Sequence, residues 1–261
     1  MIVAGCDVGS LTGKALIMKN GEVISYSIVP STIKPEKTSW NALEAALEKA
    51  RLKTGDLAYI VGTGYGRMKV PFANLNVSEL SCHGKGAHWL VPSIRTVIDV
   101  GGQDCKVIRL DDDGRILDFA MNDKCAAGTG RFLEVMAKAL EVKLDELGEL
   151  SKKSTKPAQI TSQCSVFAET EVISLIAQGV EVVDIIGGIH ESIASRIASL
   201  VHKVGLKEDV TVTGGVAKNS GVIEAIKKKL GVEIKKLPLD PQVIGALGAA
   251  LIAQEKYSSK K

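Results

Sequence analysis

Aromatic residues and long apolar runs are both scarce in this chain. Only 4% of its 261 residues are aromatic, which leaves no stacking platform for the bases of a single-stranded nucleic acid. No run of about 18 apolar residues is present, so no membrane-spanning helix is expected. The formal net charge is only +3, and we interpret the short lysine clusters as solvated faces. The composition therefore argues against nucleic-acid and membrane partners.

The beginning of the sequence also lacks the features of a secretory signal. Met1 is followed at once by a strand-like run. No charged segment and no long apolar stretch precede a small-residue cleavage site, as they would in a signal peptide. We therefore expect a cytoplasmic protein.

The cysteines form neither an even set nor a closely spaced pair. No two of them have the C-x-x-C spacing of a compact metal site. An odd number in a chain without a secretory signal argues against a disulfide framework. From composition alone, burial as small packing residues is the simpler interpretation. The five are Cys6, Cys82, Cys105, Cys125 and Cys164.

The chain carries a long internal repeat. Its first part predicts a strand over 2–7, a hairpin around Asn20-Gly21 with strands over 15–18 and 22–29, a helix over 38–53 that Gly55 ends, and a strand over 59–62. The pattern restarts with strands over 97–100, 106–110 and 115–121, the last two joined by Asp113-Gly114. A repeat of this length is typical of a duplicated fold.

The remainder of the second half is mainly helical. Helices are predicted over 129–140, 144–152, 167–178, 183–204, 217–230 and 242–254, with strands over 209–213 and 232–236. We expect two domains. Residues 1–95 with the C-terminal helix in 241–261 would form the first, and residues 96–240 would form the second.

Three glycine turns follow predicted strands, and two of them share the sequence Asp-Val-Gly. These two are Asp7–Gly9 and Asp99–Gly101, and the third is Gly214-Gly215. Glycine lets backbone N–H groups approach phosphate oxygens, and an aspartate at a strand end suits Mg²⁺. Two such turns facing each other would hold phosphates between them, with the nucleoside on the third.

In this order the turns resemble those of the ATPase superfamily that includes actin, Hsp70 and sugar kinases. The corresponding motifs are phosphate-1 at Asp7–Lys14, phosphate-2 at Asp99–Asp104 and adenosine at Thr213–Asn219. The small residues of Gly245–Ala250 resemble its second connecting helix. The resemblance implies an α/β, duplicated actin/Hsp70/sugar-kinase-like ATPase fold with two ribonuclease-H-like domains and an interdomain nucleotide cleft.

The same resemblance implies the residues of the nucleotide site. Asp7 and Asp99 would organise Mg²⁺ and water, and together with Gln103 they are the candidate catalytic residues. The phosphates would contact Gly9, Ser10, Leu11, Thr12, Lys14, Gly101, Gly102 and Gln103, and the nucleoside would contact Gly214, Gly215 and Lys218.

Two cysteine-bearing segments carry a narrower resemblance. Asn122–Glu134 reads NDKCAAGTGRFLE and Ser162–Val172 reads SQCSVFAETEV, each with its cysteine just before a predicted helix. A helix N-terminus lowers the pKa of a thiol and stabilises negative charge. With further matches at Val61–Arg67 and Ser78–His83, residues 2–253 resemble the activator components of 2-hydroxyacyl-CoA dehydratases. That family also includes the ATPase subunits of benzoyl-CoA reductases.

This resemblance implies that Cys125 and Cys164 ligate a [4Fe–4S] cluster. Such a cluster is held by four thiolates, so two from each chain imply one cluster per homodimer. The other three cysteines match no ligand position of the family and are interpreted as packing residues. His83, beside Cys82, is interpreted as a structural histidine.

The implied activity is ATP-dependent one-electron transfer. With ATP, ADP and Mg²⁺, the cluster would pass a low-potential electron to an iron–sulfur partner, and a ferredoxin or flavodoxin would supply that electron. The partner implied is a 2-hydroxyacyl-CoA dehydratase. Ser10–Lys14 departs from the Ser-Thr-Ala-Ser-Lys form of the dehydratase activators. A benzoyl-CoA-reductase-type or other double-cluster iron–sulfur reductase therefore stays open as the partner.

Two other classes of ATPase compete with this interpretation. A small-molecule kinase would use the same cleft, but 261 residues leave no room for the usual substrate-binding insertion. An assembly or chaperone ATPase would need neither Cys125 nor Cys164. An iron-containing, air-sensitive dimer would exclude both classes.

Overall fold

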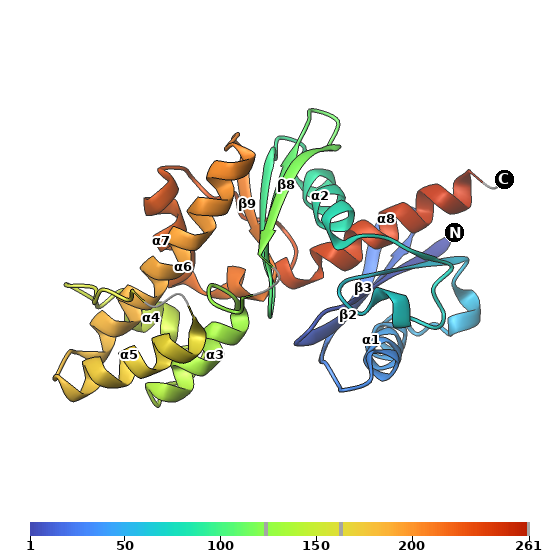
Figure 1. The fold of residues 1–261 in the computed structure, drawn as a ribbon. Coiled ribbons are helices and arrows are strands. Elements are labelled where there is room, and N and C mark those ends of the chain that lie inside the picture. The colour runs from blue at the N-terminus through green and yellow to red at the C-terminus, as the bar shows by residue number, and fades with distance from the viewer. Residues whose placement is uncertain (123–124, 162–163, 260–261) are drawn as a thin grey trace. The chain divides into compact units, whose positions relative to one another are not determined.

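The computed structural model describes residues 1–122, 125–161 and 164–259. The chain folds as two compact units: Met1–Val97, Leu110–Leu117 and Leu237–Lys261 form the first, and Ile98–Arg109 with Asp118–Lys236 form the second. Figure 1 labels their elements. None of the helices in the described ranges combines the length and the apolar character that a membrane span requires.

The first unit is built on a five-stranded sheet. β1 pairs antiparallel with β2 and parallel with β4, so the carboxyl ends of β1 and β4 lie at the same edge. The β2–β3 hairpin turns at Asn20 and Gly21, both with positive φ, as the Asn-Gly pair predicts. The strand order in the sheet is β3-β2-β1-β4-β5. The strands are β1 (Ile2–Val8), β2 (Thr12–Lys19), β3 (Glu22–Pro30), β4 (Tyr59–Thr63) and β5 (Leu75–Asn76).

Helices cover both faces of this sheet. Because successive strand residues point to opposite faces, Ile17 of β2 packs in one cluster with Leu43 of α1, whereas Leu16 and Met18 pack in another with Leu247 of α8. α2 lies against α8 on this second face (Figure 1). The helices of the unit are α1 (Pro35–Ala50), α2 (Glu79–Leu90) and α8 (Ile244–Ser258).

Two glycines allow α8 to approach the sheet and α2 closely. A side chain on Gly5 of β1 would overlap the carbonyl oxygen of Ala246, and one on Gly248 would overlap the carbonyl oxygen of Cys82. Since both neighbours are backbone atoms, a side chain at either position would push the elements apart. The run of small residues in 245–250 therefore serves close packing of α8.

The second sheet repeats the plan of the first. Its strand order is β8-β7-β6-β9, which corresponds to β3-β2-β1-β4 with β6 in the place of β1 and β9 in the place of β4. The duplicated α/β fold predicted from the internal repeat is thus confirmed. The strands are β6 (Thr96–Val100), β7 (Cys105–Leu110), β8 (Ile116–Asn122) and β9 (Val210–Thr213).

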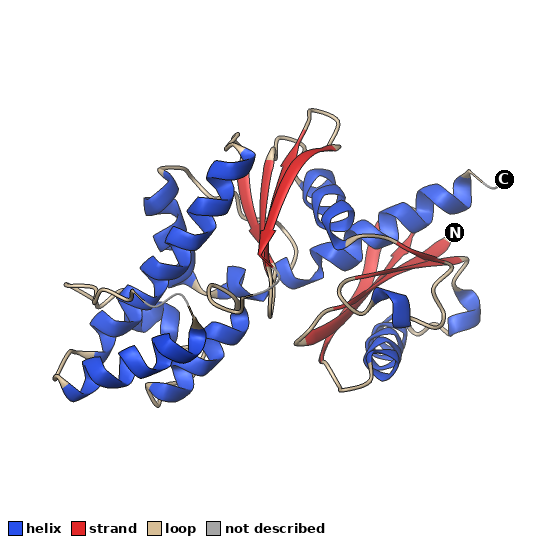
Figure 2. Ribbon diagram, in the orientation of Figure 1, coloured by secondary structure: helices blue, strands red, loops and turns tan. Residues whose placement is uncertain are grey.

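Helices make up most of the second unit (Figure 2). Along α6, Ile185, Ile189 and Ile193 recur at the spacing of an amphipathic helix. They pack in one cluster with Phe132 of α3 and Val222 of α7. The helices are α3 (Gly130–Ala139), α4 (Leu147–Ser151), α5 (Ser165–Ala177), α6 (Val182–Val204) and α7 (Ser220–Leu230).

The helix boundaries differ from the predicted ones at several places. α1 begins at Pro35, since proline favours the first turn of a helix. It ends at Ala50, where Arg51 adopts the left-handed conformation, rather than at Gly55. The sequence patterns did not indicate α2 at all. The helix predicted over 217–230 divides at Asn219 into a 3₁₀ turn and α7.

The strand predicted over 232–236 is wrong. Within the described residues this segment forms only an isolated bridge between Val210 and Ile234, supported by a hydrogen bond from Lys235 N to Val210 O at 2.7 Å. Its charged residues and the proline that follows at 238 do not support a longer ladder, because proline lacks the donor that strand pairing requires.

The close packing of α8 can be tested at Gly248. We expect Gly248→Ala to lower the free energy of unfolding by about 2 kcal/mol or more, because the added methyl group meets backbone atoms of α2. Gly55→Ala is the matched control, since nothing lies within 4 Å of the added group. Its effect should stay within about 0.5 kcal/mol. Urea unfolding followed by circular dichroism measures both, and equal effects would contradict the packing argument.

Candidate functional site

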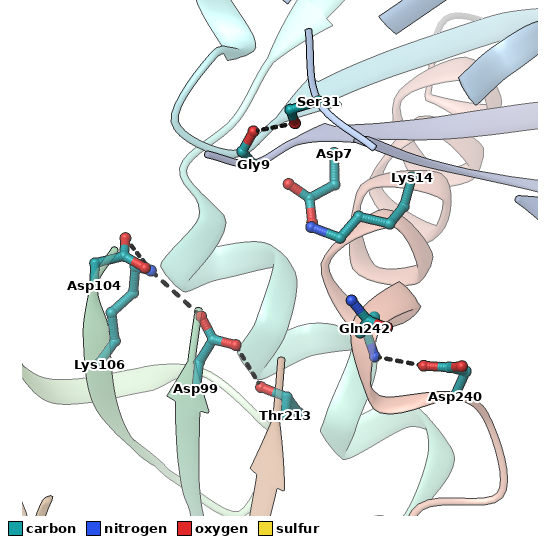
Figure 3. Close-up of polar contacts among 10 residues, drawn as sticks. All are labelled: Asp7, Gly9, Lys14, Ser31, Asp99, Asp104, Lys106, Thr213, Asp240 and Gln242. Atoms are coloured by element: carbon teal, nitrogen blue, oxygen red, sulfur yellow. Dashed lines mark hydrogen bonds and ion pairs between the residues drawn. The ribbon is translucent and has the colours of Figure 1, made fainter. Parts of the chain in front are cut away.

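Asp7 lies near the end of β1 and is paired with Lys14 of β2. The two residues face each other in the strand register, and Lys14 Nζ lies 3.1 Å from Asp7 Oδ2 (Figure 3). Both side chains are largely buried, with 6% of Asp7 and 12% of Lys14 exposed. Burying a charged group without a partner is costly, so each of these two side chains depends on the other.

Two glycines and a histidine close around the Asp7 carboxylate. A side chain on Gly64, which has φ +87°, would overlap Asp7 Oδ1. A methyl group on Gly245 would lie 3.0 Å from Asp7 Oδ2 and 2.8 Å from Nε2 of the buried His83. The glycines therefore leave the space that the carboxylate occupies.

Asp99 takes part in a larger buried network (Figure 3). Lys106 Nζ lies 3.3 Å from Asp99 Oδ2 and 2.6 Å from Asp104 Oδ2. Thr213 Oγ1 donates a hydrogen bond to Asp99 Oδ1 at 2.9 Å. Only 3% of the Lys106 side chain is exposed. The network thus places one buried cation between two carboxylates and joins β6, β7 and β9.

The two turns that follow these aspartates are closed by matching backbone hydrogen bonds. Gly9 N donates to Thr12 O at 3.0 Å, and Gly101 N donates to Asp104 O at 2.9 Å. These are matching positions of the repeat, since in each turn the glycine follows the aspartate by two residues. The duplication therefore extends from the strand order to the hydrogen bond that closes each turn.

The sequence analysis identified Lys14, included Thr213 only as the first residue of the adenosine motif, and missed Lys106 as a site residue. The signal for Lys106 was present, because both turns read Asp-Val-Gly followed by four residues and a lysine. Thr213 was also detectable, because Thr63 and Thr213 end the matching strands β4 and β9 and each precedes a glycine with positive φ. Comparing the two halves position by position would have revealed both residues.

The third turn follows β9. Gly214 has φ +85°, a conformation that favours glycine, and a side chain there would overlap the carbonyl oxygen of Val100. The chain then forms the 3₁₀ turn Gly215–Lys218. Asn219 begins α7 by accepting a hydrogen bond from Val222 N at 3.1 Å. The predicted adenosine motif is therefore a strand end, a glycine turn and a capped helix.

His190 of α6 supports the cap of α7. Its Nε2 lies 3.3 Å from Asn219 Nδ2. Since Asn219 Oδ1 accepts from Val222, the amide nitrogen is the donor and the ring nitrogen the acceptor. Burial lowers the pKa of His190 to about 4. The neutral ring that this bond requires is therefore the form present at neutral pH.

The predicted contact residues divide between the two units. Those of the phosphate-1 motif lie in the first unit, and those of the phosphate-2 and adenosine motifs lie in the second. Gly9, Ser10, Leu11, Thr12, Lys14, Gly101 and Gly102 are partly buried, Gly214 is buried, and Gln103, Gly215 and Lys218 are exposed.

The cysteines separate into two groups by exposure. Cys6, Cys82 and Cys105 are buried, and burial raises the pKa of each thiol, that of Cys82 to about 12. Cys125 is partly exposed and Cys164 is exposed. Iron binds cysteine as the thiolate, which buried apolar surroundings disfavour. The two accessible thiols therefore fit a cluster, and the three buried ones do not.

Only one of these two cysteines lies directly before a helix. Cys164 is the N-cap of α5, as predicted. For Cys125 the prediction is wrong, because α3 begins at Gly130 after a turn in which Thr129 N donates to Ala126 O at 3.0 Å. Asp123, Lys124, Ser162 and Gln163 of the two cysteine segments lie outside the described residues.

The start of α3 is bonded to the phosphate-2 turn. Gly130 N donates to Gly101 O at 2.9 Å, and Arg131 N donates to Gly102 O at 2.8 Å. The first N–H groups of a helix have no partner within it, and here the two glycine carbonyls satisfy them. The turn that follows Cys125 is therefore connected through the start of α3 to the Gly101-Gly102 turn.

Comparisons with known proteins find relatives over the whole chain. It is 50% identical to the activator of lactoyl-CoA dehydratase of Anaerotignum propionicum, with 100% of both chains covered. It is 33% identical to one of the subunits of the benzoyl-CoA reductase of Thauera aromatica, over 96% of this chain and 92% of that protein. The activator of the 2-hydroxyisocaproyl-CoA dehydratase from Clostridium difficile with bound ADPNP matches the structure at a TM-score of 0.94 and 45% identity, over 100% of this chain and 97% of that one.

A family match agrees with these relatives and with the duplicated turns. Residues 4–253 match the BadF/BadG/BcrA/BcrD ATPase family. That range contains both aspartate–lysine turns, the third glycine turn and both accessible cysteines. The chain therefore belongs to the BadF/BadG/BcrA/BcrD ATPase family, and it is an ATPase.

Proposed function

We propose that this protein is an ATP-dependent one-electron donor that activates a 2-hydroxyacyl-CoA dehydratase. In this proposal two chains form a homodimer and hold one [4Fe–4S] cluster through Cys125 and Cys164 of each. The relative of highest identity described above is named as an activator of lactoyl-CoA dehydratase. Its identity of 50%, against 33% for the benzoyl-CoA reductase relative, favours a dehydratase over a reductase as the partner.

The pair of hydrogen bonds between α3 and the phosphate-2 turn carries this proposal. Gly130 N and Arg131 N bond to the carbonyl oxygens of Gly101 and Gly102. A change of the turn on nucleotide binding would therefore move the start of α3 and, with it, the segment that carries Cys125. A ligand shifts such an equilibrium only by binding one arrangement more tightly than the other. ATP and ADP must consequently differ in their contacts with this turn.

The nucleotide roles follow from the chemistry of the three turns. Asp7 and Asp99 offer carboxylate oxygens, the ligands that Mg²⁺ prefers directly or through water, and Gln103 is exposed where it could orient a water molecule. The glycine turns offer backbone N–H groups to phosphates. The phosphate contacts proposed are Gly9, Ser10, Leu11, Thr12, Lys14, Gly101, Gly102 and Gln103, and the nucleoside contacts are Gly214, Gly215 and Lys218.

The two lysines of the repeat take different roles in this proposal. Lys14 pairs with one carboxylate in the strand register and keeps 12% of its side chain exposed, which suits a residue that also reaches a phosphate. Lys106 is held between Asp99 and Asp104 and is 3% exposed. We assign Lys106 to positioning Asp99, because a buried ammonium group that contacts both carboxylates holds them in place.

The cluster would hold one electron at low potential until it passes to the partner. Its potential depends on net charge, on hydrogen bonds to sulfur and on solvent exposure. The chain contributes two accessible thiols, one of which begins α5 where the helix N-terminus stabilises negative charge. A cytoplasmic ferredoxin or flavodoxin would reduce the cluster, and a benzoyl-CoA-reductase-type or other double-cluster reductase is the alternative partner.

Cluster content tests the proposal directly. The protein purified without oxygen should contain about four iron and four sulfide per dimer. Cys125→Ser and Cys164→Ser should each lose nearly all of both, because two thiolates of the shared site disappear from the dimer. Cys82→Ala, a change at a buried cysteine, should keep the wild-type content. An iron-free wild-type protein that hydrolyses ATP would overturn the electron-donor proposal and favour a kinase or an assembly ATPase.

The choice of partner is tested by reconstitution. With ATP and a chemical reductant, the iron-loaded protein should activate a 2-hydroxyacyl-CoA dehydratase purified without its own activator. A benzoyl-CoA-reductase-type component under the same conditions is the comparison. Transfer to the second and not to the first would establish the alternative partner.

The lysine roles predict different kinetic effects. Lys106→Met should lower the rate of ATP hydrolysis by at least about tenfold, equivalent to 1.4 kcal/mol of barrier, because Asp99 and Asp104 would then repel each other. Lys14→Met should raise the KM for ATP, because a phosphate contact is lost, and it should also lower the unfolding temperature, because Asp7 loses its partner. Steady-state ATPase assays separate the two effects.

A double variant controls for general damage around Lys106. Asp104→Asn together with Lys106→Met removes one carboxylate and the lysine, so the repulsion disappears and part of the hydrolysis rate should return. Wild-type turnover in Lys106→Met alone would contradict the positioning role. The positioning role would also be contradicted if the double variant unfolds at the wild-type temperature but hydrolyses ATP no faster than Lys106→Met.

A further inference from the structure

Glu171 of α5 accepts hydrogen bonds from Thr161, and we call this contact the Glu171 clamp. Thr161 N donates to both carboxylate oxygens of Glu171, at 2.9 Å and 3.2 Å, and Thr161 Oγ1 donates to Glu171 Oε1 at 2.8 Å. Thr161 precedes the cysteine by three residues and Glu171 follows it by seven. The contact therefore joins two points of the chain that stand on either side of Cys164.

The position of Glu171 on α5 explains how it can act on Cys164. Seven residues correspond to about two turns of an α-helix at 3.6 residues per turn, so Glu171 and the N-cap residue Cys164 lie on the same side of the helix. The Cys164 side chain makes no capping hydrogen bond to α5. Helix capping therefore does not fix the direction of its thiol, whereas the Thr161–Glu171 contact joins the described residues on either side of Cys164.

A second set of hydrogen bonds holds the chain before Thr161. The Asp184 carboxylate of α6 accepts hydrogen bonds from Ser154 Oγ at 2.8 Å and from the backbone N–H groups of Thr155 and Lys156 at 3.0 Å each. These bonds hold the pKa of Asp184 below its usual value, the bond from the Lys156 N–H contributing most. Ala158 N also donates to Asp184 O at 2.9 Å. Segment 154–161 is thus attached to α6 at one end and to α5 at the other.

We propose that Glu171 is a positioning residue that holds Cys164 in place as a cluster ligand. This inference rests on the proposed function, since it concerns the same cluster. It adds that the two ligands of a chain have different attachments. Cys125 is connected through α3 to the phosphate-2 turn, whereas Cys164 begins α5, the helix whose Glu171 holds Thr161. In this arrangement nucleotide binding moves Cys125, and Glu171 keeps Cys164 in the same position when Cys125 moves.

Variants of the anaerobically purified, iron-loaded dimer test this role. Glu171→Ala removes all the acceptors of the clamp, and Glu171→Gln keeps one uncharged acceptor oxygen. Thr161→Val removes the hydroxyl donor and keeps the backbone one. Glu169→Gln, on the same helix, is the matched control. The readouts are iron per dimer, the rate of iron release to a ferrous chelator, and the electron paramagnetic resonance spectrum of the reduced cluster.

The expected order of iron release is Glu171→Ala fastest, Glu171→Gln and Thr161→Val intermediate, and Glu169→Gln equal to wild type. We expect at least about a fivefold increase for Glu171→Ala, with a changed resonance spectrum and unchanged helix content by circular dichroism. Wild-type release rates and spectra in both Glu171→Gln and Thr161→Val would overturn the clamp while leaving the proposed function intact. An iron-free wild-type protein would instead overturn the proposed function itself.

Discussion

Each of the two sheets buries an aspartate–lysine pair where its central strand enters a glycine turn, and the rest of the site depends on this burial. A buried charge that loses its partner is strongly destabilising, so the lysine must arrive from the neighbouring strand in register. The Asp7–Lys14 pair meets this condition in the register of β1 and β2, and the Asp99–Lys106 pair joins the neighbouring strands β6 and β7. The burial of each aspartate with its lysine constrains the turn length, the strand pairing and the glycines beside each carboxylate.

The duplicated halves have diverged within this constraint. Position 12 of the first turn is threonine, whereas its counterpart in the second turn is Asp104, which gives Lys106 a second carboxylate. The second half also carries the helix that begins on its turn, since Gly130 N bonds to Gly101 O. The first half therefore presents a single ion pair. The second combines a network with one more carboxylate and a hydrogen-bonded connection to the turn that follows Cys125.

Much of the fold could be predicted because it depends on local patterns. The Asn20-Gly21 hairpin and the repeated strands follow from turn chemistry and alternation. α2 could not be predicted, since Gly84 and Gly86 lower its intrinsic helix propensity and its packing against α8 compensates. The turn after Cys125 and the Glu171 clamp were also out of reach, because both depend on hydrogen bonds that no spacing rule encodes. Lys106 was within reach through the repeat.

The last helix of the chain completes the core of the unit that is synthesised first. Val3, Leu16 and Met18 of the first sheet are covered by α8, which follows all the residues of the second unit in the sequence. As the polypeptide leaves the ribosome, that apolar face lacks the cover that α8 provides until residues 244–258 emerge. The first unit is thus translated first but completes its core last. Until then, the apolar face of its sheet that α8 covers stays exposed, and exposed apolar surface promotes aggregation.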